Sequence, residues 1–279
     1  MISVNKIFLI SLLIISVKVF AQNSIQEQYD YANSLFEQEK YFDAITEFKR
    51  LFFFDKQKQF EFLSNYYIGL SYKNGGKFDE ALRYFTLAEI KSKNEDEYFR
   101  AKIFQVRVNI LRRTTIQANR ILDQLQNDRA FASKDQEIKY WRGWAYIFSD
   151  EWDKASQILS ENNLDTTLAA ICQNADDNMY SVNFAKYSSY IIPGFGQFYT
   201  GEYISGAISL GWNVLFGYLT INSFVEDRVF DGLVIGNFLW LRFYTGNLQN
   251  AEKLAKQKNL SISNKALDFL QHNFNGLKP

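Results

Sequence analysis

The feature that most constrains this chain is an alanine that returns every 37 residues, at Ala44, Ala81, Ala118 and Ala155. Around most of these alanines an aromatic residue stands three positions earlier and a large apolar residue four positions later. The second copy, Phe78-Asp-Glu-Ala81-Leu-Arg-Tyr-Phe85, is an example. Residues at these spacings share one face of an α-helix, and the small alanine lets a neighbouring helix approach closely. A period of this length indicates an array of helical repeats.

A second position, twelve residues before each alanine, marks a preceding helix. It is usually small, and its four occupants are Ala32, Gly69, Val106 and Gly143. Three residues further on, the same helix face carries Leu35, Tyr72, Asn109 and Tyr146. Between the two helices of the second copy, Gly75-Gly76 is a turn signal. The spacing therefore predicts four helix pairs over residues 25–162.

This pattern resembles the tetratricopeptide-repeat family. The second copy matches the family consensus best, at Gly69, Tyr72, Phe78, Ala81, Phe85 and Ala88, whereas the third copy is degenerate. The period of 37 residues exceeds the family's usual length of about 34. The resemblance implies a solenoid whose concave groove holds a peptide or protein partner. Asn65, Lys102 and Lys139 are candidate groove residues, although a solvated face explains them equally well, and the array can instead serve only as a brace.

The first 21 residues predict a secretory signal peptide. Lys6 precedes an apolar core at residues 7–17, and Val19 and Ala21 occupy the small-residue positions before a cut. The apolar core is short for a membrane span, although an uncleaved anchor is the alternative. We therefore expect an exported bacterial protein whose mature chain begins at Gln22.

The C-terminal third changes character and predicts a transmembrane helical hairpin within residues 187–247. The first expected span, residues 203–224, has no ionisable side chain except tyrosine and as a helix would be about 33 Å long. The second, residues 229–245, carries Asp231 and Arg242, which would have to reach opposite interfaces. Gly232 and Gly236 have the spacing that lets membrane helices approach closely. The alternative is a buried core of soluble helices.

Before the first span stands the block Pro193-Gly-Phe-Gly-Gln-Phe-Tyr-Thr-Gly201. Proline disfavours helical backbone at the preceding residue, and the glycines permit a tight turn of the chain. The block resembles the Pro-Gly-x-Gly-Gln-x-Tyr-x-Gly motif of small bacterial two-helix membrane modules akin to the TM2-domain family. The motif positions are Pro193, Gly194, Gly196, Gln197, Tyr199 and Gly201. The resemblance covers residues 187–258 and implies membrane association without a known activity.

Two further segments complete the expected organisation. Residues 163–186 read as a capping helix and linker, and residues 248–279 as an amphipathic tail. The pentapeptides that begin at Phe198 and Phe243 share the sequence Phe-Tyr-Thr-Gly, and in a hairpin we expect both at the same membrane face, as in an aromatic belt.

Composition excludes several classes of function. Lys+Arg and Asp+Glu number 31 each, so the chain lacks the basic footprint of a nucleic-acid-binding protein. With one cysteine, Cys172, and one histidine, His272, it cannot build a Cys/His zinc site, and a nucleophilic triad would depend wholly on His272. The acidic cluster at residues 174–178 favours a turn over a metal site. We expect no catalytic residue, no cofactor and no metal.

The sequence thus predicts an all-α chain: a tetratricopeptide-like helical-repeat solenoid followed by a transmembrane helical hairpin. The expected function is an exported scaffold or adaptor, anchored in the inner membrane with its repeats facing the periplasm, that binds a protein partner. The alternative is a structural subunit of a membrane complex in which the hairpin makes the key contacts. An enzyme that uses carboxylates alone has no paired-acid motif to support it.

Overall fold

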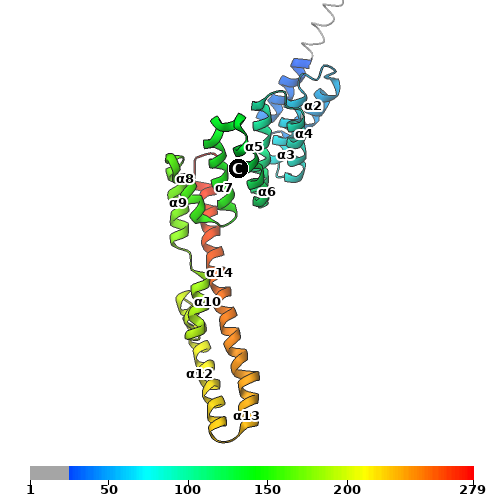
Figure 1. Cartoon of the computed structure of the whole chain (residues 1–279). Coiled ribbons are helices and arrows are strands. Elements are labelled where there is room, and N and C mark those ends of the chain that lie inside the picture. The colour runs from blue at the N-terminus through cyan, green and yellow to red at the C-terminus, as the bar shows by residue number, and fades with distance from the viewer. Residues whose placement is uncertain (1–24) are drawn as a thin grey trace, which may run out of the picture. The chain divides into compact units, whose positions relative to one another are not determined.

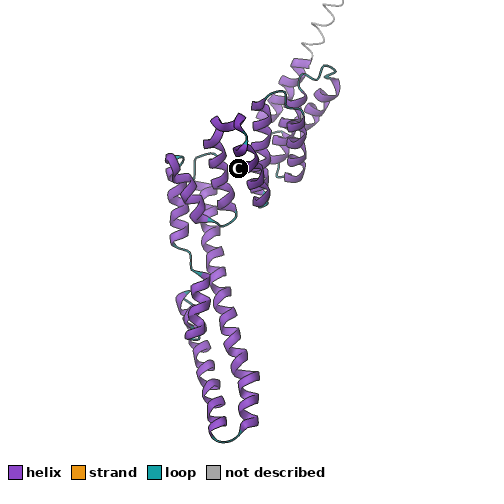
Figure 2. Ribbon diagram, viewed as in Figure 1, coloured by secondary structure: helices purple, strands orange, loops and turns teal. Residues whose placement is uncertain are grey.

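The computed structural model describes residues 25–279, so the expected signal peptide lies outside the described residues. Within that range the chain forms helices joined by turns, and none of those residues lies in a β-strand (Figure 2). The expected all-α class is confirmed. The chain divides into two compact units: Met1–Ala169 together with Leu277–Pro279 form the first, and Ala170–Gly276 form the second. Most of the α-helices of both units are labelled in Figure 1.

In the first unit the helices pack in the order in which they occur along the chain. A helix over residues 25–37 comes first. It is followed by α2 (Tyr41–Phe54), α3 (Glu61–Asn74), α4 (Phe78–Ile90), α5 (Glu95–Leu111), α6 (Thr115–Asn127), the short η1 (Arg129–Lys134), α7 (Asp135–Phe148), α8 (Trp152–Ser160) and η2 (Glu161–Asn163). From α2 to α8 each α-helix packs against the next, and α5 also contacts α3 and α7.

The 37-residue period of the sequence is a period of the backbone as well. The second helix of each pair begins at the same phase, at Tyr41, Phe78, Thr115 and Trp152. Two residues before each of these starts, the backbone is left-handed, with φ of 60° at Glu39, 71° at Gly76, 56° at Arg113 and 62° at Asp150. The residue after each left-handed position donates its N–H to the carbonyl five residues earlier, on Leu35, Tyr72, Asn109 and Tyr146. The third copy has this turn although its sequence matches worst.

Each helix pair is closed by the small residues that the sequence singled out. The four alanines at the 37-residue interval are completely buried, as are the large residues four positions later: Phe48, Phe85, Leu122 and Leu159. A Cβ added to Gly69 would lie 2.9 Å from the Phe85 ring, and one added to Gly143 would lie 2.8 Å from Leu159. Glycine is therefore required at both positions by the close approach of the facing side chain.

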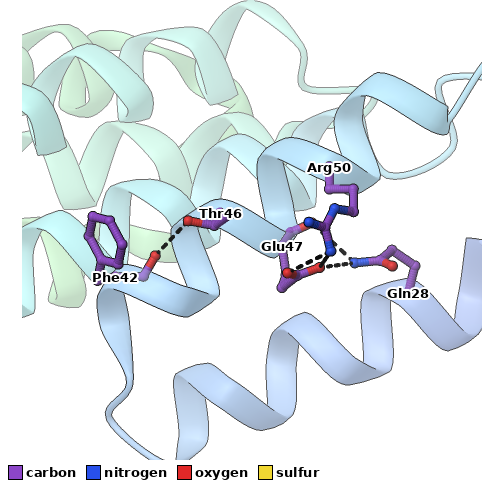
Figure 3. Close-up of polar contacts among 5 residues, drawn as sticks. All are labelled: Gln28, Phe42, Thr46, Glu47 and Arg50. Atoms are coloured by element: carbon purple, nitrogen blue, oxygen red, sulfur yellow. Dashed lines mark hydrogen bonds and ion pairs between the residues drawn. The ribbon is translucent and has the colours of Figure 1, made fainter.

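A polar bridge joins the first described helix to α2, as Figure 3 shows. Gln28 Nε2 donates to Glu47 Oε2 at 2.8 Å, while Arg50 Nη1 lies 2.9 Å from Glu47 Oε1. One turn earlier, Thr46 Oγ1 donates to the Phe42 carbonyl at 3.1 Å. Such partly exposed contacts are each worth about 1 kcal/mol or less, so the buried apolar residues account for most of the stability of this pair.

The helices of the second unit are α9 (Thr166–Asp177, within which the division falls), α10 (Val182–Ile191), α11 (Phe195–Tyr199), α12 (Tyr203–Val225), α13 (Val229–Val234), the π-helical η3 (Ile235–Trp240) and α14 (Leu241–Asn273). Helices α10 and α11 pack on α14, and α12 packs on α13, η3 and α14.

Two expected boundaries are not found in this unit. The second apolar run and the tail are not separate elements, because α13, η3 and α14 follow one another without a break as far as Asn273. Residues 247–273 contain no proline and many strong helix formers, so nothing in the chain stops the helix there. Similarly, the helix α9 continues to Asp177, through most of the cluster expected to turn.

Candidate functional site: the Asn247 cluster

A buried asparagine on α14 gathers the segments around the Pro-Gly motif. Asn247 Oδ1 accepts hydrogen bonds from the Gly194 N–H at 2.8 Å, from Gln197 Nε2 at 3.0 Å and from Ser209 Oγ at 2.8 Å. Its Nδ2 donates to the Ser189 carbonyl at 3.1 Å. One side chain therefore joins α10, α11, α12 and α14, and we call these five residues the Asn247 cluster.

The glycines of the motif are required by this close packing. Gly194 has a φ of +93°, and a Cβ there would lie 2.3 Å from the Gly206 carbonyl oxygen. A Cβ on Gly196 would lie 2.2 Å from the Ala185 carbonyl oxygen, and its N–H donates to Ser189 Oγ at 2.8 Å. No other residue fits either position without a shift of the backbone.

The remaining motif residues shape the chain on either side of the cluster. Pro193 follows an extended Ile192, with φ −124° and ψ 105°, as a residue before proline prefers. The Tyr199 hydroxyl accepts from the Ser181 N–H at 3.1 Å, and its ring packs edge-on against Phe184 at 4.9 Å. Gly201, with φ +79°, turns the chain into α12. The structure thus buries Gly194, Gly196 and Gln197 in the cluster, while Gly201 lies exposed at the turn that follows it.

Helix α12 is long and apolar enough to cross a membrane, and it is the one such helix among the described residues. Only 22% of its most apolar stretch is buried. The exposed fraction is 80% for Ile204, 62% for Val214 and 76% for Val225, and Phe230 on α13 is 78% exposed. These side chains are exposed, whereas the core helix of a water-soluble fold is mostly buried.

Two glycines of the segment that follows α12 lie close to that helix. A Cβ on Gly232 would lie 2.9 Å from the Phe224 ring, and one on Gly236 would lie 3.2 Å from Thr220 Cγ2. Both glycines therefore face α12, and a larger residue at Gly232 would push the helices apart.

Charged groups pair at both ends of α12. Near its start Lys258 bonds to Glu202 at 2.8 Å, and Glu252 pairs with Lys186 at 2.8 Å and Lys256 at 2.6 Å. Hydrogen bonds from these two lysines hold the pKa of Glu252 at about 2. Beyond its end, Arg228 pairs with Glu226 at 2.8 Å and with Asp231 at 3.6 Å.

Arg242 does not lie at the level of either end of α12, where the sequence predicted it. Its neighbour Phe243 stacks on Phe216 at 5.1 Å, midway along α12, so the exposed Arg242 is level with the middle of that helix instead of an end. The two Phe-Tyr-Thr-Gly segments are also at different levels, because the Phe198 ring lies against Gly206, about 15 Å along the helix from Phe216. The expectation that both segments share one level is therefore wrong.

The expected groove residues of the repeats all have partners in the first unit. Asn65 is buried and donates to the Glu61 carbonyl at 2.7 Å, Lys102 pairs with Glu89 at 2.8 Å, and Lys139 pairs with Asp135 at 3.1 Å. A different set on α5 and α7 contacts the end of the chain. Arg107 Nη2 donates to the Lys278 carbonyl at 2.8 Å, and the Tyr140 hydroxyl donates to the Leu277 carbonyl at 2.5 Å.

The Arg107 side chain lies between two aromatic rings, at 4.3 Å from the Phe104 centroid and 4.7 Å from the Trp141 ring. Burial lowers the pKa of Arg107 and, with a contribution from Arg107 itself, lowers the pKa of Lys73 to about 8. Sequence reasoning missed this set because aromatic residues at helical spacing look like ordinary core. No cluster of three or more potential metal-ligating side chains occurs in residues 25–279.

Comparison with protein-family models, with curated proteins and with solved structures finds no match for this chain. Two features of the chain bear on its function: the exposed apolar surface of α12 and α13, and the face of the repeats that holds residues 277–279.

Proposed function

We propose that this chain is an exported, membrane-tethered scaffold or adaptor that binds a protein partner at the periplasmic face of the bacterial inner membrane. The observation that carries the proposal is the exposure of large apolar side chains along α12 and α13. Leaving apolar surface in water is unfavourable by about 25 cal/mol per Å², and a lipid environment removes that penalty. The repeats differ, because their periodic apolar residues are buried against one another.

The membrane part would be a helical hairpin, with α12 crossing in one direction and α13, η3 and the start of α14 returning. The length of α12 supports this, because its 23 residues extend about 35 Å. The contacts of Gly232 and Gly236 with α12 are those of closely packed membrane helices. Arg242 would extend its long side chain toward the interface, with local thinning of the bilayer.

Two membrane crossings are consistent with the hydrogen bonds between the repeats and residues 277–278. Leu277 and Lys278 accept hydrogen bonds from Tyr140 and Arg107, so the end of the chain lies on the same side as the repeats. An even number of membrane crossings between the repeats and residue 277 returns the chain to that side. If the N-terminal segment directs export, that side is the periplasm.

The repeats would form a tetratricopeptide-like solenoid. Support comes from the turn that recurs with the same hydrogen bond in all four copies, and from the contacts of α5 with both α3 and α7. Stacked first helices of this kind present a continuous surface to a partner. The chemistry of that surface is aromatic and cationic, with Arg100 above the Tyr66 ring at 5.8 Å and Arg107 two turns later.

The alternative is a structural subunit whose hairpin contacts other membrane helices. One observation favours it: Asn237 on η3 is exposed and bonds only to its own helix, at the Leu233 carbonyl. A polar side chain on a lipid-facing surface gains by meeting another helix.

Site-specific photo-crosslinking in intact cells tests both functions in the full chain. A photoreactive residue would replace exposed Arg100 on α5 or Phe230 on α13, with Ile116 on α6 as the background position. An adaptor gives a discrete adduct from Arg100 and none from Ile116. A structural subunit gives its adduct from Phe230. If no position forms an adduct above background, both functions are wrong.

A further inference from the structure

We propose that the repeats carry a peptide-binding site whose resident ligand is the chain's own C-terminal segment, Leu277–Pro279. We call Phe104, Arg107, Tyr140 and Trp141 the tail site. This site rests on the proposed adaptor function in one respect, because both require that the face formed by α5 and α7 binds peptides. The tail site would recognise the backbone of an extended segment, and residues 277–279 would occupy it when no partner is bound.

The two polar contacts of the tail site go to main-chain atoms. Arg107 Nη2 donates to the Lys278 carbonyl at 2.8 Å, and the Tyr140 hydroxyl donates to the Leu277 carbonyl at 2.5 Å. Donors on two different helices thus contact consecutive peptide groups. Every extended segment offers such carbonyls, so the ligand that these donors fit is an extended peptide. The two hydrogen bonds do not depend on the side chains of that peptide.

The surroundings of Arg107 orient its guanidinium toward a hydrogen-bond acceptor that lies outside α5. The guanidinium is held between the rings of Phe104 and Trp141, which fixes its direction. The side chain is half-buried, its Nε is buried without a hydrogen-bond partner, and the acceptor of its Nη2 is the Lys278 carbonyl. Burying a cation without an acceptor is unfavourable; the repeats contribute the charge of Glu137, and the tail carbonyl adds a direct hydrogen-bond acceptor.

The aromatic surroundings extend the tail site onto α3. The Tyr66 ring packs edge-on against Phe104 at 5.4 Å, and Tyr140 packs edge-on against Trp141 at 5.2 Å. Rigid aromatic walls with one central cation lose little conformational entropy when a segment binds. The repeats therefore offer a preformed surface, on which another extended segment can replace residues 277–279.

A tethered ligand competes strongly with a free one. A segment attached to the same chain has an effective concentration in the millimolar range. We therefore expect a free peptide to bind the intact chain at least tenfold more weakly than a chain from which residues 277–279 have been removed.

The experiment uses the full chain in detergent micelles, intact or ending at Gly276, and a fluorescent synthetic peptide of residues 272–279. Fluorescence anisotropy measures its dissociation constant. In the shortened chain, Tyr140→Phe keeps the ring and removes one donor, which should weaken binding about fivefold. Arg107→Gln should weaken it further. Arg142→Gln, on the same helix as Tyr140 but paired with Asp123 at 2.8 Å, is the matched control and should bind as the shortened chain does.

Equal affinity of the intact and shortened chains, or no binding to either, would overturn the inference. So would full affinity in both Tyr140→Phe and Arg107→Gln, because the peptide would then bind elsewhere. Circular dichroism of Tyr140→Phe separates loss of the site from loss of the fold. These outcomes are distinct from failure of the adaptor function, which would appear as no adduct from Arg100 in intact cells.

Discussion

The side-chain oxygen of Asn247 accepts a hydrogen bond from the Gly194 N–H at 2.8 Å, across 53 residues of sequence. The Gly194 backbone is left-handed and buried, so its N–H cannot join a helix and needs a partner. Asn247 supplies that partner while also accepting from Gln197 and Ser209. The contact explains why a Pro-Gly motif and a distant asparagine form one structural corner.

Replacing Asn247 with alanine should destabilise the second unit by about 3 kcal/mol, because the buried Gly194 N–H loses its acceptor and Gln197 Nε2 keeps only its 3.3 Å hydrogen bond to the backbone carbonyl of residue 247. Hydrogen exchange at residues 194–201 is the measurement, and protection there should fall by at least a hundredfold. Asn237→Ala is the matched control, since Asn237 is exposed and bonds only to its own helix. Equal protection in the two variants would show that the cluster contributes nothing.

Gly196→Ala and Gly211→Ala make the same chemical change with opposite expected results. At Gly196 the new Cβ would lie 2.2 Å from a backbone oxygen, whereas at Gly211 nothing lies within 4 Å. We expect Gly196→Ala to lower the melting temperature of the second unit by more than about 10 °C, and Gly211→Ala to leave it unchanged or raise it slightly. Circular dichroism melts in micelles measure both. Similar melts for the two variants would contradict the packing described around Gly196.

Much of the first unit is predictable from sequence because its determinants are local. The buried alanines recur at a fixed interval of 37 residues, which is visible in the sequence. The close packing at Gly69 and Gly143 and the turn at Gly76 each involve residues of a single helix pair. The left-handed turns at Glu39 and Arg113 are not predictable in this way, because these residue types are not typical of that conformation, whereas an aspartate such as Asp150 adopts it more readily. There the hydrogen bond to the carbonyl five residues earlier, together with packing of the pair, overrides residue preference.

The structural features that the sequence did not predict depend on contacts between residues that are far apart in the chain. The motif predicted a turn, but its partner Asn247 lies 50 to 53 residues away, at the end of the pentapeptide that begins at Phe243, and neither segment predicts the hydrogen bonds between them. The level of Arg242 depends on the register between α12 and the returning helix, which is set by contacts such as Phe216 with Phe243. Arg107 and Tyr140 are recognisable as a site only when residues 277–279 are seen against them.

The recurring turn predicts that glycine is favoured at its left-handed position. Glu39→Gly should stabilise the first helix pair by about 0.5 kcal/mol, because the strain of a left-handed side chain is relieved and glycine's extra entropy offsets part of the gain. Gly76→Ala should destabilise its pair by about 1 kcal/mol, since space is open there and only backbone strain is added. Hydrogen exchange in α2 and α4 measures both effects, and a change of the same sign in both variants would contradict a shared turn.

The lowered pKa of Lys73 predicts a rise in stability with pH. Burial and the neighbouring Arg107 lower this pKa from 10.5 to about 8, so between about pH 8 and pH 10 the unfolded chain binds a proton that the folded chain has lost. Stability therefore increases with pH in that window. Above it, the opposite contribution of Tyr66 begins, since burial raises the pKa of Tyr66 to about 12.

Lys73→Met should remove that rise and stabilise the first unit at pH 7. Urea unfolding at pH 7, 8, 9 and 10 compares it with the unaltered chain and with Lys77→Met, which changes an exposed lysine and should keep the rise. A pH dependence that is the same in all three proteins would show that Lys73 is not the group responsible.

Membrane embedding of α12 and the returning helix is the claim on which the tether, and hence the adaptor, depends. Alkaline carbonate extraction of membranes from cells that make the full chain tests it most directly, with immunoblotting of pellet and supernatant. We predict that the intact protein stays with the membrane pellet. Release into the supernatant would contradict the account, because α12 and α13 would then be covered by protein instead of lipid.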